Sequence, residues 1–224
     1  MSDLLLADPA PPEAPATSTE LAASLVARLC HDLISPASAI VSGVDLLEDP
    51  TAADMKDDAL SLISQSARKM VSVLAFSRVA FGGSASAENF QSDELRKLSE
   101  GIFASIRPNL DWAVGPAVVN KPAARALLNL AQLGSGCVAR DGVVRVEAHE
   151  EGGDLLMSAT CTGTRVKLRD EVATGLRGEP LGEGLLHGHW VQAFYVHSFL
   201  EAAGGAVDAS VSEDRAVIRA RAPL

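Results

Sequence analysis

Cysteine is scarce in this chain, and long apolar runs are missing from it. The three cysteines, Cys30, Cys137 and Cys161, are an odd number and form no CxxC spacing. They therefore predict neither a disulfide framework nor a zinc site. No stretch approaches the roughly 18 uninterrupted apolar residues of a membrane span. We expect a reduced, cytoplasmic protein with no membrane partner.

Positive charge is also in short supply. Lysine and arginine together number 19 against 29 aspartates and glutamates, which gives a formal net charge of −10. Sequence-independent binding to nucleic acid needs a basic surface, so we expect no nucleic-acid partner. Acids and prolines, rather than a basic start and an apolar block, occupy residues 1–17. We therefore expect a disordered tail there and no secretory signal.

Two long helical patterns fill residues 18–83. A capping box, a threonine followed three residues later by glutamate, begins the first pattern at Thr17. This helix runs to about Leu47, and Thr51 repeats the start signal for a second helix that ends at Gly82. Long helices joined by a turn of a few residues form an antiparallel hairpin.

The hairpin leaves apolar surface on both helices. Two hairpins from two chains would bury it in a four-helix bundle, and a symmetric homodimer is the commonest oligomer. The alternative is that the hairpin packs on its own C-terminal half. We expect the dimeric bundle, because long apolar stripes suit bundle packing. With Leu29 at 0° on a helical wheel, the stripe of the first helix contains Leu25, Val26, Leu33, Ala37, Ile40, Val44 and Leu47.

His31 lies on the opposite, polar face of the first helix, about 200° from Leu29. Its neighbours there include Ser35, Ser38 and Ser42. Because these side chains are small, the imidazole is open to another molecule. The alternative is an ordinary solvated histidine. A proline inside a helix costs about 3 kcal/mol, so the proline at position 36 indicates that a local bend is used here.

A change of pattern after residue 83 marks a second domain. Residues 84–90 have the composition of a flexible linker. Helices and antiparallel hairpin strands then alternate over 91–224, which predicts an α+β sandwich with helices on one face of a sheet. His187, His189 and His197 fit no standard ligand spacing, so we expect no metal site. The expected helices are 93–106, one beginning at 122, and 190–203; the expected strands are 109–114, 143–149, 155–161, 207–211 and 216–220.

The run from His31 to Pro36 (HDLISP) resembles the H-box of sensor histidine kinases, in which a helical hairpin precedes a Bergerat-type ATPase domain. The nucleotide motifs are degenerate here. Asn129 begins an asparagine box whose magnesium-binding asparagine is replaced by Leu133, and Cys161 stands in place of the adenine-binding aspartate. Phosphates then lack their metal and the base lacks its acceptor. The resemblance implies a degenerate ATPase-like domain that binds no ATP.

A dimeric hairpin with such a histidine and a degenerate ATPase-like domain resembles the ChpT-type histidine phosphotransferases of alphaproteobacteria. The resemblance is strongest in residues 27–32 and 46–50, and it continues in 84–90 and 178–180. It implies that the imidazole of His31 attacks an aspartyl phosphate and passes the phosphoryl group on. The partners implied are the receiver domain of a CckA-like hybrid histidine kinase and CtrA-like response regulators. Magnesium would come with the receiver, and the chain would need no cofactor of its own.

Two neighbours of His31 are candidate supporting residues. Arg28, one turn away, would attract the phosphate, or it is an unpaired surface arginine. Asp32 would orient the imidazole, or it only solubilises the helix. Ser35 and Ser38, together with Ser42, would form the receiver-docking surface. Two other classes of protein stay open, a divergent active kinase and a non-catalytic adaptor that binds a receiver.

Overall fold

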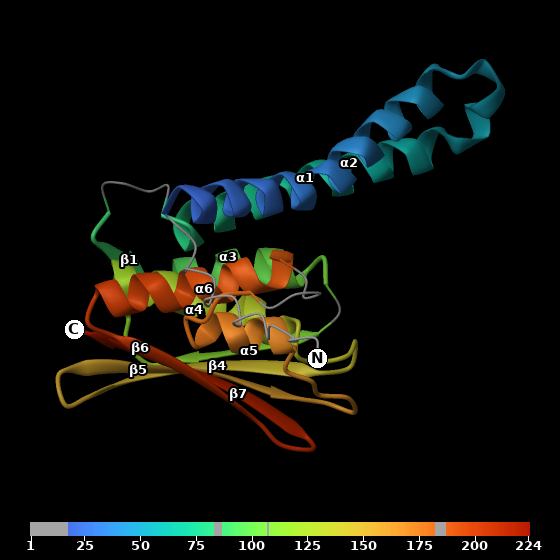
Figure 1. Ribbon diagram of the computed structural model, residues 1–224. Helices are drawn as coiled ribbons and strands as arrows, with labels where there is room; N and C mark the ends of the chain where they lie inside the picture. Colours follow the sequence, from blue (N-terminus) through green and yellow to red (C-terminus); the bar gives the residue numbers. More distant parts are fainter. Residues whose placement is uncertain (1–17, 83–86, 107, 182–186) are drawn as a thin grey trace, which may run out of the picture.

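The computed structural model describes residues 18–82, 87–106, 108–181 and 187–224, so the expected tail 1–17 lies outside it. Figure 1 shows three layers: a long helical hairpin, a layer of shorter helices beneath it, and a sheet whose one face these helices cover. No helix in the described ranges is both long and apolar enough to cross a membrane.

The hairpin consists of α1 (Ser18–Glu48), the 3-10 helix η1 (Pro50–Met55) and α2 (Lys56–Ala80). The sequence predicts that the second helix begins at Thr51, whereas a tight turn of 3-10 helix comes first. Its cap is Asp49, whose carboxylate accepts hydrogen bonds from the Thr51 backbone N–H at 2.8 Å and the Thr51 hydroxyl at 2.7 Å. These bonds satisfy donors that the helix start leaves open.

Within the described residues, the second part of the chain forms a mixed five-stranded sheet and four helices. The strand order is β2-β4-β5-β7-β6, and a small separate ribbon pairs β1 with β3. The helices are α3 (Ser92–Phe103), α4 (Lys121–Ser135), α5 (Asp170–Leu176) and α6 (His187–Ala202). The strands are β1 (Asn89–Gln91), β2 (Asn109–Val114), β3 (Val118–Asn120), β4 (Val143–Glu151), β5 (Asp154–Thr162), β6 (Ala206–Val211) and β7 (Arg215–Pro223).

The α+β architecture expected from the sequence is present, with two differences. The strands are not all antiparallel, because β2 and β4 pair in parallel, and α4 lies in the connection between them, as a parallel crossover requires. The expected linker 84–90 is also shorter than predicted. Its first three residues lie outside the described part, and its last two, 89 and 90, belong to β1.

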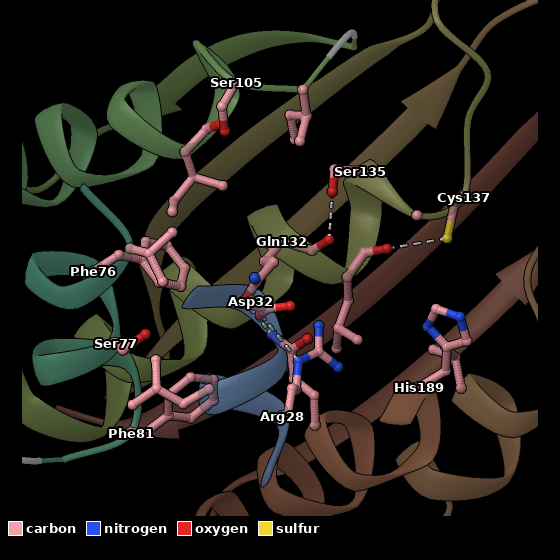
Figure 2. Close-up of a pocket in the computed structure, with 18 of the residues that line it drawn as sticks. Arg28, Asp32, Phe76, Ser77, Phe81, Ser105, Gln132, Ser135, Cys137 and His189 are labelled. Atoms are coloured by element: carbon pink, nitrogen blue, oxygen red, sulfur yellow. Dashed lines mark hydrogen bonds and ion pairs between the residues drawn. The ribbon is translucent and has the colours of Figure 1, made fainter. Parts of the chain in front are cut away.

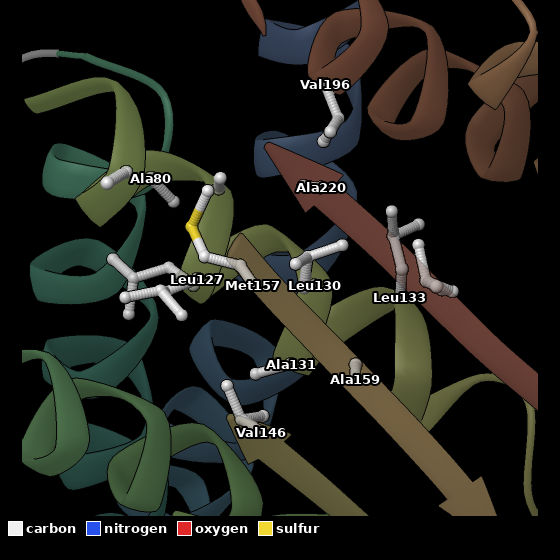
Figure 3. Close-up of a cluster of buried hydrophobic side chains, with 14 of the residues drawn as sticks. Ala80, Leu127, Leu130, Ala131, Leu133, Val146, Met157, Ala159, Val196 and Ala220 are labelled. Atoms are coloured by element: carbon white, nitrogen blue, oxygen red, sulfur yellow. The ribbon is translucent and has the colours of Figure 1, made fainter. Parts of the chain in front are cut away.

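The core lies between the sheet and its helices, around α4. Leu127 and Leu130 of α4 are fully buried. Figure 3 shows them with Met157 of β5 and Val196 of α6, which come from two different sides of the core. On β4, the buried residues Val144, Val146 and Ala148 alternate with exposed Arg145 and half-buried Glu147. Apolar side chains therefore face the helices at every second strand position, as the period of a strand dictates.

A buried polar network joins the end of the hairpin to this core. The Asn129 side-chain amide donates to the backbone oxygen of Ala80 at 3.0 Å and of Arg125 at 2.9 Å. The Gln192 amide donates in turn to the Asn129 side-chain oxygen at 2.9 Å and to Gln132 at 2.8 Å. The last turn of α2, the middle of α4 and the start of α6 are thereby held together.

The apolar surface of α1 is used in two ways. At its start, Leu21 and Leu25 pack on Trp190, Val191 and Phe194 of α6. This end of the hairpin therefore packs on the C-terminal half of its own chain, which was the alternative to the dimer. Further along, a second set of apolar side chains stays exposed. These exposed residues are Val26, Ile34, Val41 and Val44 on α1, and Leu60, Leu62, Val71 and Leu74 on α2.

Candidate functional site

His31 lies near the middle of α1, and its side chain is 85% exposed. Its Nδ1 atom is 3.4 Å from the Oδ1 atom of Asp32. A carboxylate beside Nδ1 favours a proton on that nitrogen, which leaves the lone pair of Nε2 available to solvent. The structure therefore presents an accessible imidazole nitrogen, with the exposure that the helical wheel predicts.

The three serines predicted to flank His31 are all exposed. Ser35, Ser38 and Ser42 lie on α1 one to three turns beyond the histidine. Because α1 is continuous over this stretch, they form a strip of small side chains on its polar face. A bulky partner can approach the imidazole along this strip without a steric obstacle from α1 itself.

Arg28 does not lie as an unpaired surface side chain. Only 19% of it is exposed, and its Nε atom lies 4.0 Å from Asp32 Oδ2. Its guanidinium donates a hydrogen bond to the backbone oxygen of Gly188 in α6. Burial lowers the pKa of Arg28, and the negative charge of Asp32 opposes that effect. The guanidinium is thus a partly desolvated positive charge at the junction of α1 and α6.

One groove brings His31 and its two candidate supporting residues together with His189, which the sequence analysis did not assign to the site. The groove has a volume of ≈ 440 Å³ and is lined by His31, Arg28 and Asp32 from α1 and by Gly188 and His189 from α6. The spacing of His187, His189 and His197 argues against a metal site, and it indicates no other role for His189. No local pattern could have found it, because the contact between α1 and α6 joins positions 160 residues apart.

A deeper cavity of ≈ 300 Å³ lies next to this groove and shares Arg28, Asp32 and His189 with it. Figure 2 shows Arg28 and Asp32 entering from α1, Gln132 from α4 and His189 from α6. Apolar side chains in the rest of the wall include Val73 and Phe76 of α2, Ile102 of α3 and Leu133 of α4. The polar side chains around Arg28 therefore lie at a junction between the hairpin and the C-terminal domain.

The positions of the degenerate nucleotide motifs belong to the core. Leu133 is 5% exposed and Cys161 is fully buried. The neighbouring thiol of Cys137, together with burial, raises the pKa of Cys161. Neither side chain supplies a carboxylate or amide oxygen to a nucleotide, and Asn129 is committed to the network with Ala80. In the described part of the chain, no three histidine, cysteine, aspartate or glutamate side chains group as a metal site would require.

Comparison with known proteins identifies the family. A family model described as the histidine phosphotransferase C-terminal domain matches residues 92–215. The chain is also 30% identical over 189 residues to the protein phosphotransferase ChpT of Brucella abortus strain 2308, covering 84% of this chain and 88% of that protein. The chain belongs to the ChpT-type histidine phosphotransferases. The family resemblance found in the sequence is confirmed.

The fold of this ChpT-type chain agrees with a solved structure. A bacterial phosphotransferase determined at 1.7 Å matches with a TM-score of 0.81 and 26% identity, over 94% of this chain and all of that one. The catalytic domain of the histidine kinase ThkA is less similar, with a TM-score of 0.48 and 14% identity over 60% of this chain and 93% of the domain. The fold assignment depends on the first of these two structures.

Proposed function

We propose that this histidine phosphotransferase carries a phosphoryl group on His31 within a multi-step phosphorelay. The donor is the receiver domain of a CckA-like hybrid histidine kinase, and the acceptors are CtrA-like response regulators in the cytoplasm. The observation that carries the proposal is the exposed imidazole of His31, with its Nδ1 beside Asp32 and a groove containing Arg28 at its side.

The chemistry needs few groups from this chain. The lone pair of His31 Nε2 attacks the phosphorus of an aspartyl phosphate, so a P–N bond forms while the P–O bond to the aspartate breaks. Asp32 stabilises the proton on Nδ1 and the positive charge that develops on the ring. Arg28 offers N–H donors to the phosphoryl oxygens. The receiver supplies the magnesium ion, and the return step to a second aspartate reverses the same bonds.

Three structural features support the rest of the proposal. The exposed strip of Ser35, Ser38 and Ser42 gives a receiver a flat surface on which to dock. Leu133 and Cys161 support a carrier that uses no ATP, because a leucine and a buried thiol replace the groups that bind metal and adenine. The exposed apolar set on α1 and α2 supports a homodimer, which would bury that set in a four-helix bundle.

The test is phosphoryl transfer from a labelled, phosphorylated receiver. His31→Ala should abolish labelling of this chain and leave its helical content unchanged, because the exposed side chain contributes little packing. His149, another exposed histidine, lies on β4, and His149→Ala is the matched control that should accept label normally. Label retained by His31→Ala would place the acceptor elsewhere. Receiver binding without labelling of the native chain would instead favour an adaptor.

A further inference from the structure

We propose that His189, on the first turn of α6, is the second histidine of the transfer site and contacts the phosphoryl group carried by His31. The inference rests on the proposed function of His31 and adds to it a contribution from the C-terminal domain. It assigns a role to a histidine that neither the family motif nor the chemistry of the attack requires.

The backbone of His189 is held against α1 on both sides. On one side, the Gly188 oxygen accepts a hydrogen bond from Arg28. On the other, Trp190 is buried in the apolar cluster that contains Leu21 and Leu25 of α1. The indole N–H of Trp190 also donates to the backbone oxygen of Glu179 at 2.9 Å. The position of His189 relative to α1 is therefore built into the fold rather than left to a loop.

The side chain of His189 lines the same groove as His31. Arg28 and Asp32 lie in that groove as well, and its volume of ≈ 440 Å³ is ample for a phosphoryl group. Figure 2, which draws the adjoining cavity, shows His189 and Arg28 on two sides of that cavity, reaching it from α6 and α1. A phosphoryl group on His31 would therefore meet donors from both helices, Arg28 from its own and His189 from the C-terminal domain.

The charges around His189 make its pKa sensitive to a nearby anion. It faces Arg169, at the start of α5, and Arg28 of α1; burial and these two positive charges lower its pKa, while Glu171 of α5 opposes them. Asp32 and Lys69 of α2 line the adjoining cavity. Without phosphate the imidazole is thus neutral near pH 7. A phosphoryl dianion in the groove would reverse this balance and raise the pKa of His189.

His189 takes no part in bond making under this proposal. The P–N bond to His31 forms as the P–O bond to the receiver aspartate breaks, and His189 donates an N–H to a non-bridging oxygen throughout. The same contact would hold the phosphoryl group after transfer. It would also fix the direction in which the group projects towards the next receiver.

The first experiment follows the imidazole of His189 by NMR in the full chain, before and after phosphorylation of His31 with the small-molecule donor phosphoramidate. The pKa of His189 should rise by about one unit or more, while the pKa of the distant His149 stays constant. His189→Ala should move the phosphorus-31 resonance of phospho-His31, and His149→Ala should not. An unchanged His189 pKa on phosphorylation overturns the proposal.

The second experiment separates contact with the phosphoryl group from receiver docking. At saturating phosphorylated receiver, His189→Ala should slow single-turnover transfer about tenfold while leaving the receiver Kd unchanged. His189→Asn keeps an N–H donor and should restore most of the rate. A slower rate explained entirely by weaker receiver binding, or an asparagine variant as slow as the alanine variant, contradicts the proposal.

The two proposals fail in different ways. If phosphoramidate modifies His31 and a phosphorylated receiver does not, the phosphorelay role fails while the His189 titration still gives its answer. If His31 accepts no phosphoryl group from either donor, both proposals are wrong. A normal transfer rate in His189→Ala leaves the phosphorelay role intact and removes His189 from it.

Discussion

Asn129 holds three elements together through one side chain. Its amide donates to Ala80 and Arg125, and its oxygen accepts from Gln192. Asn129, Ala80 and Gln192 are all buried. Removing one partner of a buried hydrogen bond costs more than the bond itself contributes, because the others stay desolvated. This residue, at the start of a degenerate asparagine box, is therefore a structural clamp between hairpin and core.

We expect Asn129→Ala to lower the free energy of unfolding by about 2–3 kcal/mol, because it leaves the Ala80 oxygen and the Gln192 amide without their partner. Urea unfolding followed by circular dichroism measures the change. The matched control is Gln65→Ala, since the Gln65 amide hydrogen bonds to Ser61 on the exposed surface of α2. The control should change stability by less than about 0.5 kcal/mol. Equal effects would refute the clamp.

Two further residues predict how the chain responds to nucleotide. Leu133 and Cys161 are buried and supply no oxygen to metal or adenine. Calorimetric titration with magnesium and ATP should therefore show no saturable heat up to millimolar ligand, which corresponds to a binding free energy of only about −4 kcal/mol. A micromolar dissociation constant would restore the divergent-kinase alternative.

At the scale of elements, the contact of α5 with α6 depends on a glycine. A Cβ atom at Gly175 would lie 2.7 Å from the backbone oxygen of Trp190 and 2.8 Å from both Ala193 Cβ and the Phe194 backbone nitrogen. These atoms belong to a packed helix and cannot move separately. The absence of a side chain at 175 thus sets how closely α5 approaches α6, and with it the position of the helix that carries His189.

We expect Gly175→Ala to destabilise the protein by about 1–3 kcal/mol through overpacking, although alanine favours an isolated helix by about 1 kcal/mol. Gly188→Ala in α6 is the control, because a Cβ there meets no atom within 4 Å. The midpoint of urea unfolding should fall for Gly175→Ala alone. A stabilised Gly175→Ala variant would mean that α5 and α6 can separate at little cost.

The elements that the sequence predicts are those with a sustained period. The apolar spacing of α1 and the strict alternation in β4 and β5 gave their positions to within a few residues. α5 has seven residues and β1 and β3 have three each, which is too short for any period to show. The parallel pairing of β2 with β4 depends on which strands become neighbours in the sheet, and no local pattern encodes that.

The residues of the candidate site fall into the same two groups, those that a local period predicts and those that depend on tertiary packing. His31 and its serines could be predicted because all of them lie on one face of one helix. The inward position of Arg28 could not, because it depends on the Gly188 oxygen of a helix far along the chain. The position of His189 beside α1 depends on the same contact between distant helices. Sequence periodicity locates the exposed histidine, whereas tertiary packing decides which side chains surround it.

At the scale of the whole molecule, the exposed apolar set predicts association. The set differs from the predicted stripe, because Leu33 and Ile40 are half-buried within the protomer whereas Ile34 and Val71 are 63% and 66% exposed. Side chains of this size gain about 25 cal/mol per Å² when they leave water. A second hairpin that covered Ile34 and Val71 would take both side chains out of water.

Ile34→Asp or Val71→Asp should therefore convert a dimer to a folded monomer, because an unpaired carboxylate cannot be buried in the interface. Light scattering after size exclusion measures the mass, and circular dichroism checks the fold. Ser38→Asp, on the polar face of α1, is the control that should stay dimeric and weaken only receiver binding. Dimers that survive both apolar substitutions would show that this face is not the interface.

The hairpin projects beyond the helical layer at its η1 end (Figure 1). Its start is supported by α6, and its last turn by the Asn129 clamp, but within the described chain the tip is supported mainly by the pairing of α1 with α2. Backbone amides near η1 should therefore exchange with solvent through low-energy local openings that leave the rest of the molecule folded. His31 lies away from the tip, in the part of the hairpin that α6 and the Asn129 clamp support. Fraying can begin at the tip without disturbing His31. If two copies associate as proposed, fraying should slow as protein concentration rises.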